Sequence, residues 1–171
     1  DVEYYRSIGV PRSNRFLFLA RFSSIKGPDL AIEACKKAGV GLDMIGDTQI
    51  TNEPELVKKC YDMAADTQSL DGNRHIRIVG NQTRSETIYW YSQTHCMIHP
   101  NQRFREPFGL APVEAMACGT PVITSSTTSL PEVAGDAGII VDPRKPDAIA
   151  KAMELVVRPK VSAILRERGL T

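Results

Sequence analysis

The sequence predicts an α/β fold, a Rossmann-like three-layer sandwich in which helices cover both faces of a six-stranded parallel sheet. Short apolar runs alternate with segments of helical spacing six times along the 171 residues, which is the pattern of such a sheet. The first run, FLFLA at 16–20, is apolar throughout, as expected of a central strand buried on both faces. Polar residues follow the runs, at the edge where these sheets bind ligands.

The elements follow a lead-in over 1–14. Strands are expected at 16–20, 42–45, 75–79, 96–99, 122–124 and 138–141. Helices are expected at 28–38, from 51–54 through 63, after a cap formed by Ser85 and Glu86, from Pro112 onward, at 130–133 as a turn or short helix, and at 146–157. A last helix at 160–168 is expected to be cut off at its end. The length of 171 residues fits one domain over 1–171.

The composition is that of an ordinary globular domain. Hydrophobic residues make up 42% of the chain, charged residues 24%, and the net charge is +1, which does not indicate nucleic acid as a partner. The four cysteines form no C-x-x-C pair and fall in predicted helices and a strand, which favours buried thiols in a reducing cytoplasm. The chain begins at Asp1 instead of Met, so we expect a missing upstream part.

Charged and polar residues are expected to converge at the carboxyl ends of the strands. Arg21 and Lys26 follow the first strand, Asp47 the second, Asn81 the third and Glu106 the fourth. An arginine can form bidentate contacts with phosphate oxygens, and a lysine acts as a compact point charge. The two cations therefore suit a diphosphate, with a pair of ordinary surface cations as the alternative.

The stretch 100–121 combines a loop, a glycine turn and a helix start. Gly109 allows a turn that a side chain would obstruct, and Pro112 suits the first turn of a helix. The N-terminus of that helix favours an anion. Glu106 and Glu114 lie eight positions apart, and paired carboxylates beside an anion site suit a nucleotide sugar. The alternative is a solvated loop glutamate and a helix glutamate that interacts only with the dipole.

The segment from Glu106 through Glu114, followed by AMACGTPVI at 115–123, resembles the glutamate-x7-glutamate signature of retaining glycosyltransferases of the GT-B fold, the family 4-like "glycosyl transferases group 1". The resemblance covers about 16–157 and corresponds to the C-terminal, donor-binding half of that fold. It implies that the N-terminal acceptor domain is absent from this chain. The fragment alone is then expected to bind donor weakly and to be inactive.

The resemblance also implies roles for individual residues. Arg21 and Lys26 would hold the donor diphosphate, and Glu106 would bind hydroxyls of the donor sugar, which makes these three the expected catalytic residues. Glu114 would bind the ribose hydroxyls. The remaining expected donor-binding residues are Asp47, Gly80 and Asn81, of which the last two would lie near the base, and the backbone N–H groups of Phe108, Gly109 and Leu110.

As a function, the resemblance implies transfer of a hexose from a UDP or GDP sugar to a sugar or lipid-linked acceptor in polysaccharide biosynthesis, without metal or other cofactor. The partners would be the nucleotide-sugar donor and the missing N-terminal domain. A cytoplasmic location is expected, with membrane contact only through the missing half. Two loops depart from the family pattern. The loop at 46–48 reads Gly-Asp-Thr, where the family often has a second glycine, and Thr128-Ser129 stands where many members have two glycines.

Other functions fit less well. The chain has neither the G-x-G-x-x-G of dinucleotide dehydrogenases nor a P-loop. It also lacks an Asp-x-Asp motif, so the sequence does not indicate a metal site. Structural roles are favoured for His75, His95 and His99, and packing is favoured for the aromatic residues at 89–91. A non-catalytic nucleotide-sugar-binding or interaction domain that retains the fold remains the main alternative, and an epimerase or phosphorylase of similar plan is a weaker one.

Overall fold

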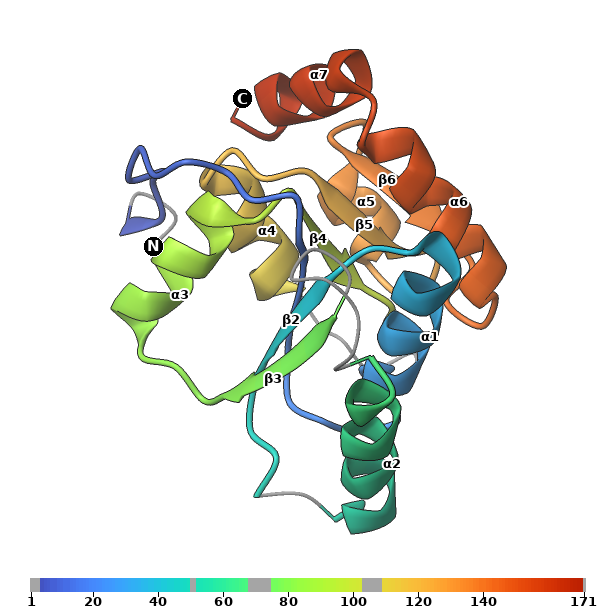
Figure 1. Ribbon diagram of the computed structural model, residues 1–171. Helices are drawn as coiled ribbons and strands as arrows, with labels where there is room; N and C mark the ends of the chain where they lie inside the picture. The colour runs from blue at the N-terminus through green and yellow to red at the C-terminus, as the bar shows by residue number, and fades with distance from the viewer. Residues whose placement is uncertain (1–3, 50–51, 68–74, 103–108, 171) are drawn as a thin grey trace.

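Parallel pairing joins the six strands of the described residues into one sheet, in the order β3-β2-β1-β4-β5-β6 (Figure 1). The computed structural model describes residues 4–49, 52–67, 75–102 and 109–170. The strands are β1 (Phe16–Leu19), β2 (Leu42–Ile45), β3 (Ile76–Gly80), β4 (Cys96–His99), β5 (Val122–Ser125) and β6 (Gly138–Val141). The predicted fold class is confirmed.

Helices cover both faces of the sheet. They are α1 (Pro28–Ala38), α2 (Pro54–Ala65), α3 (Arg84–Gln93), α4 (Leu110–Ala117), α5 (Leu130–Ala134), α6 (Pro146–Val156) and α7 (Pro159–Gly169). In Figure 1, α1, α2 and α6 lie on one side of the sheet and α3 and α4 on the other. Phe16 and Phe18 accordingly pack with α1 and α6, whereas Leu17 packs with α3 and α4. This alternation makes β1 a central strand of a three-layer sandwich.

One predicted helix start is wrong. The cap of α3 is Thr83 and not Ser85, because Thr83 accepts a hydrogen bond from the backbone N–H of Glu86 and donates its own N–H to the Glu86 carboxylate. Ser85 already lies within the first turn. The T-x-x-E spacing of this capping box was present in the sequence. Helix α2 begins at Pro54, within the predicted start at 51–54, and the side chain of Glu53 forms no cap.

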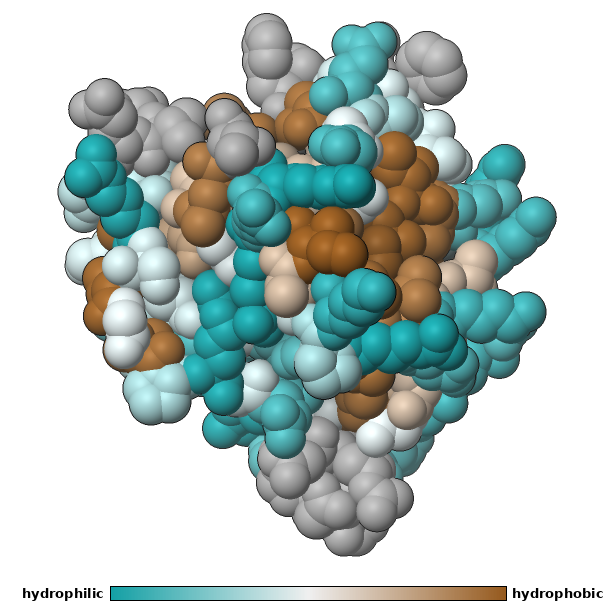
Figure 2. Space-filling model, turned by 90° about the horizontal axis from the view of Figure 1, so that it is seen from above, coloured by the Kyte–Doolittle hydropathy of each residue, from teal (hydrophilic) through white to brown (hydrophobic). Residues whose placement is uncertain are grey.

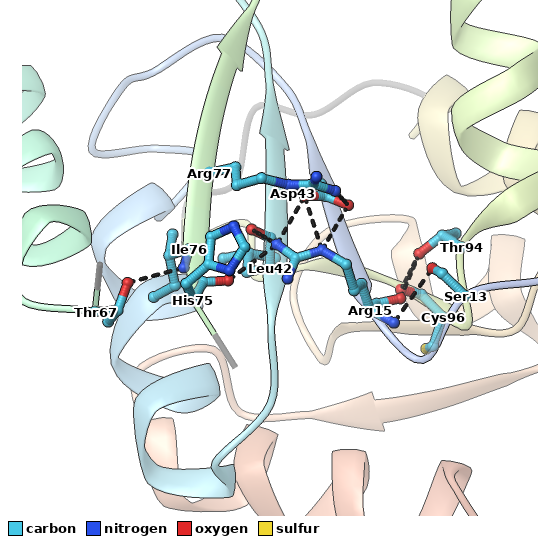
Figure 3. A network of polar contacts seen from close by, with 10 residues as sticks. All are labelled: Ser13, Arg15, Leu42, Asp43, Thr67, His75, Ile76, Arg77, Thr94 and Cys96. Carbon is cyan, nitrogen blue, oxygen red and sulfur yellow. Dashed lines mark hydrogen bonds and ion pairs between the residues drawn. The ribbon is translucent and has the colours of Figure 1, made fainter. Parts of the chain in front are cut away.

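A buried ionic network fixes the three strands β1, β2 and β3 relative to one another (Figure 3). Arg15, just before β1, donates to the Asp43 carboxylate at 2.8 Å and to the carbonyl oxygens of Leu42 and His75 at 2.9 Å each. Arg77 on β3 donates to both oxygens of the same carboxylate, to Oδ1 at 2.6 Å and to Oδ2 at 2.9 Å. Burial would raise the pKa of Asp43, but the hydrogen bonds from the two arginines outweigh it and lower the pKa.

Arg12 holds the lead-in against the ends of two helices. Its guanidinium donates to the carbonyl oxygens of Thr94, Cys118 and Gly119 at 2.9, 3.1 and 2.7 Å, and to the hydroxyl of Thr120 at 2.8 Å. These carbonyls belong to the segments that follow α3 and α4, where a cation also complements the helix dipole.

The order in which successive strands are added across the sheet reverses between β1 and β4, the two central strands, which are themselves parallel. From β1 the chain moves outward to β2 and β3, and it then returns to β4 and moves outward the other way. The connections that leave the carboxyl ends of β1 and β4 therefore diverge, and such a switch point is where open parallel sheets bind ligands.

Seen from above, from the side where α7 lies, the surface carries a hydrophobic patch among charged side chains (Figure 2). Exposed apolar residues of the described chain include Ile8, Val157, Ile164 and Leu170. Such a surface suits a packing contact better than a polar ligand. Among the described residues, no helix combines the length and the apolar character that crossing a bilayer requires.

Candidate functional site

A pocket lies at the carboxyl ends of β2 and β3. It has a volume of about 300 Å³ and is lined by Asp47, Thr48 and Gln49 from one loop and Gly80 and Asn81 from the other. The structure therefore brings together three of the predicted donor-binding residues, Asp47, Gly80 and Asn81. The volume is at the lower end of the range found for small-molecule pockets.

Gly46 joins this pocket to the end of β1. Its φ is +151°, and a Cβ atom built on it would lie 1.9 Å from the carbonyl oxygen of Ala20. The N–H of Gly46 donates to Gly80, and the N–H of Phe22 donates to the carbonyl of Asp47. The absence of a side chain at Gly46 thus lets the pocket wall approach the loop that carries the predicted phosphate-binding cations.

That loop, 21–27, is called the cation loop below. Arg21 is exposed and Lys26 is half-buried. Burial lowers the pKa of Lys26, and the positive charge of Arg21 lowers it further, so the two side chains lie within electrostatic range of each other. The structure brings these two predicted residues together. An anion placed between them would relieve their repulsion.

Two residues from other parts of the chain hold the cation loop in place. Glu53, before α2, accepts hydrogen bonds from the backbone N–H of Ser24 at 3.0 Å and from its hydroxyl at 3.2 Å. Gln102, after β4, donates its side-chain Nε2 to the carbonyl of Ser24 at 2.9 Å and its backbone N–H to Ile25 at 2.7 Å. Neither anchor was predicted from the sequence, because no local pattern indicates such distant partners.

Helix α4 begins at Leu110, directly after Gly109, and Pro112 lies in its first turn, as expected. This residue has left-handed backbone angles, with φ 51° and ψ 49°, and a Cβ atom built on it would lie 2.5 Å from Leu130 Cδ2. A glycine cap provides no side-chain acceptor for the first N–H groups of the helix. The side chain of Leu110 is exposed. Glu106 and Phe108, the other predicted residues of this segment, lie outside the described residues.

Glu114 lies in a polar cluster between α3, α4 and the lead-in. The buried Tyr91 donates its hydroxyl to Glu114 Oε2 at 3.0 Å. Burial, followed by the negative charge of Glu114, raises the pKa of Tyr91 well above its usual value. Tyr5 also lies beside Glu114, and its hydroxyl accepts a hydrogen bond from Arg84. The described lining of the pocket does not include Glu114. Tyr91 was expected only to pack, so its polar role was missed.

Within the described residues, no three His, Cys, Asp or Glu side chains gather in a way that would hold a metal ion. Metal independence remains a prediction. The four cysteines are buried and unpaired. Burial raises the pKa of Cys60 to about 12 and of Cys118 to about 11, so neither thiol is a ready nucleophile at neutral pH.

Comparison with known proteins identifies relatives of this chain. The family model described as "Glycosyl transferases group 1" matches residues 6–168. O-antigen chain mannosyltransferase B of Escherichia coli is 45% identical over 75 residues, which cover 44% of this chain and 19% of that protein. D-inositol 3-phosphate glycosyltransferase of Mycobacteroides abscessus is 30% identical over 147 residues, which cover 82% of this chain and 31% of that protein. The chain spans less than a third of either relative.

Solved structures share the fold. HepE of Anabaena, in complex with UDP and glucose, superposes with a TM-score of 0.84 at 20% identity, covering 99% of this chain and 49% of HepE. The C-terminal domain of the glycosyl transferase group 1 family protein LpcC of Francisella tularensis superposes with a TM-score of 0.75 at 19% identity, covering 99% and 94%. At these identities the likeness shows the fold alone.

Proposed function

Because the chain belongs to the glycosyl transferases group 1 family, we propose that it is the donor-binding domain of a retaining, metal-independent glycosyltransferase. The donor is a nucleoside diphosphate hexose, with uridine or guanosine as the nucleoside. The acceptor is a sugar or a lipid-linked sugar, and its binding domain is N-terminal and lies outside this chain. The chain alone binds donor and transfers nothing.

One observation carries this proposal: the pocket of Asp47, Gly80 and Asn81 lies against the cation loop. The contact of Gly46 with Ala20 and the hydrogen bond between Phe22 and Asp47 join the two. A nucleoside in the pocket would therefore place its diphosphate toward Arg21 and Lys26. The ligands in the crystal structure of HepE, UDP and glucose, are of this chemical class.

In this function the cations stabilise the leaving group. As the bond between the sugar and the diphosphate breaks, negative charge builds up on the phosphate oxygens. Glu53 and Gln102 hold the backbone of the cation loop at Ser24, so the loop that carries Arg21 and Lys26 needs little reorganisation to stabilise that charge. The glycine-capped N-terminus of α4 would contribute N–H donors to the same anion. Glu106 is proposed to bind hydroxyls of the sugar, and Glu114 those of the ribose.

Calorimetric titration tests the proposal. The chain is titrated with UDP, GDP and ADP in the presence of EDTA, and the titrations are repeated with Arg21→Ala and Glu114→Ala. One nucleotide should bind with micromolar to millimolar affinity, and each variant should weaken it about tenfold, or about 1.4 kcal/mol. The matched controls Arg158→Ala and Glu154→Ala alter exposed residues at the C-terminal end of α6, outside the proposed site, and should leave the affinity unchanged. Binding that survives both site substitutions would contradict the proposal.

A further inference from the structure

His99 presents an unusual feature at the carboxyl end of β4. Its side chain is 3% exposed, yet neither ring nitrogen has a hydrogen-bond partner in the described structure. Neighbouring residues of β4 alternate between the two cores, with Ile98 on the α1 side and Met97 on the α3 side. Because buried polar groups are nearly always paired, an unpaired imidazole costs stability and needs an explanation.

A second group of the same kind follows β5. Thr128 has a positive φ of 61°, which among the described residues is otherwise found at glycines. Its buried hydroxyl has no hydrogen-bond partner among the described residues. A β-branched residue rarely adopts this conformation, since its side chain crowds the backbone. Strain of this type persists where the surrounding structure imposes it, often at sites that bind ligands.

Hydrogen bonds tie these two positions into one region. The carbonyl of His99 accepts from the N–H of Asn101 at 3.0 Å and from the hydroxyl of Ser125 at 3.2 Å. The hydroxyl of Thr127 in turn donates to the carbonyl of Asn101 at 2.9 Å. The ends of β4 and β5 are thus held together, and both unpaired groups lie at the ligand-binding edge of the sheet.

The protonation state of His99 indicates what it can bind. Burial lowers its pKa to about 3, and the nearby positive charge of Lys26 contributes to the shift. The ring is therefore neutral at pH 7, with one nitrogen as donor and one as acceptor, and the Thr128 hydroxyl likewise both donates and accepts. A phosphate only accepts, so it would leave the acceptor nitrogen of His99 unpaired. A hydroxyl group can act as donor or as acceptor, so a ligand with several hydroxyl groups can pair both ring nitrogens.

We propose that His99 and Thr128 form a subsite that binds hydroxyl groups of the donor hexose, beside the cations that hold the diphosphate. This inference rests on the proposed function and specifies which residues of the chain recognise the sugar. In this arrangement the two groups are left unpaired in the free protein so that the hexose pairs them on binding. They contribute to affinity for the sugar and not to affinity for the nucleotide.

The test compares nucleoside diphosphates with their hexose conjugates. Dissociation constants of UDP, UDP-glucose, GDP and GDP-mannose are measured for the chain, and the ratio of the diphosphate constant to the conjugate constant defines the hexose advantage. His99→Leu and Thr128→Val remove the polar groups, while His99→Gln keeps a donor and an acceptor. His95→Leu is the matched control, because His95 lies before β4 and its ring contacts the Val156 carbonyl.

With the nucleoside that the chain binds, uridine or guanosine, His99→Leu and Thr128→Val should each reduce the hexose advantage about tenfold. The affinity for the diphosphate should stay within twofold. His99→Gln should retain part of it. Both apolar variants should also raise the Tm, because they remove an unpaired buried group, whereas His95→Leu should lower the Tm and leave the ratio unchanged. Equal weakening of diphosphate and conjugate, an unchanged ratio, or a lower Tm in both apolar variants would overturn the inference. A wild-type chain that binds none of the four compounds would instead refute the proposed function.

Discussion

The hydroxyl of Tyr91 on α3 lies 3.0 Å from the Glu114 carboxylate on α4. Tyr91 is fully buried and cannot turn away, so it fixes the direction in which Glu114 presents its remaining acceptor sites. The pair links the packing of two helices to the residue proposed to bind ribose.

Replacing Tyr91 by Phe should therefore weaken nucleotide binding about threefold to tenfold, because Glu114 keeps its charge and loses its orientation. Calorimetry measures the effect. Tyr89→Phe, on the exposed side of the same helix, is the matched control and should leave binding unchanged. Unaltered affinity in the Tyr91 variant would show that the orientation of Glu114 by Tyr91 does not contribute to binding.

Glu53→Gln tests the anchoring of the cation loop. The substitution preserves shape but replaces a charged acceptor of the Ser24 N–H and hydroxyl by a weaker neutral one. Nucleotide affinity should fall about fivefold, with little change in Tm, because the loop loses position and the core is untouched. Glu55→Gln, in the exposed first turn of α2, should have no effect on affinity. Equal affinities of both variants for the nucleotide would show that Glu53 does not position the cation loop for binding.

Asp43→Asn should reduce the free energy of unfolding by about 3 kcal/mol, since it leaves Arg15 as a buried cation without its carboxylate partner. Asp147→Asn, which removes an exposed pair with Lys37, should change the Tm little. Urea unfolding measures both. Similar losses in the two variants would show that the buried network does not contribute as described.

The same network predicts a pH dependence. The folded-state pKa of Asp43 lies below its value in the unfolded chain, near 3.9. Its contribution to stability is thus complete above the unfolded-state pKa and is lost as the pH falls through the folded-state pKa. Stability of the wild type should therefore decrease more steeply below pH 4 than that of Asp43→Asn. Parallel pH profiles would contradict this assignment.

Gly46→Ala should cost about 3 kcal/mol, because the new methyl group would collide with the Ala20 carbonyl and separate the ends of β1 and β2. Gly39→Ala provides the control: Gly39 also has a positive φ, but a Cβ atom there meets no atom within 4 Å, so only backbone strain of about 1 kcal/mol is expected. Equal costs would mean that the approach of the two strand ends is not tight.

The sequence predicted the elements well because their signals are local. Pro28 and Gly39 mark the two ends of α1, and the apolar runs at 42–45, 96–99 and 138–141 are the observed strands. The grouping of Asp47, Gly80 and Asn81 followed from the strand assignment, since parallel strands place their carboxyl ends at one edge.

Contacts between distant residues were not predictable in this way. Glu53 is 29 positions from Ser24, and Arg12 is more than 100 from the Cys118 carbonyl that it binds. Nothing near either residue in the sequence distinguishes it from an ordinary surface charge. His99 was expected to have a structural role, and its lack of hydrogen-bond partners was not predicted. Pairing of a buried side chain depends on neighbours from several elements and is not encoded in β4 alone.

A nucleoside diphosphate is proposed to bind between the cation loop and the pocket. Amide chemical shifts of the ¹⁵N-labelled chain, recorded with and without the nucleotide found by calorimetry, test it most directly. We expect shifts at 21–27, 46–49, 80–82 and 109–114, with 153–169 unchanged. Shifts confined to α7 and the lead-in, with the ends of β1, β2 and β3 unaffected, would contradict it.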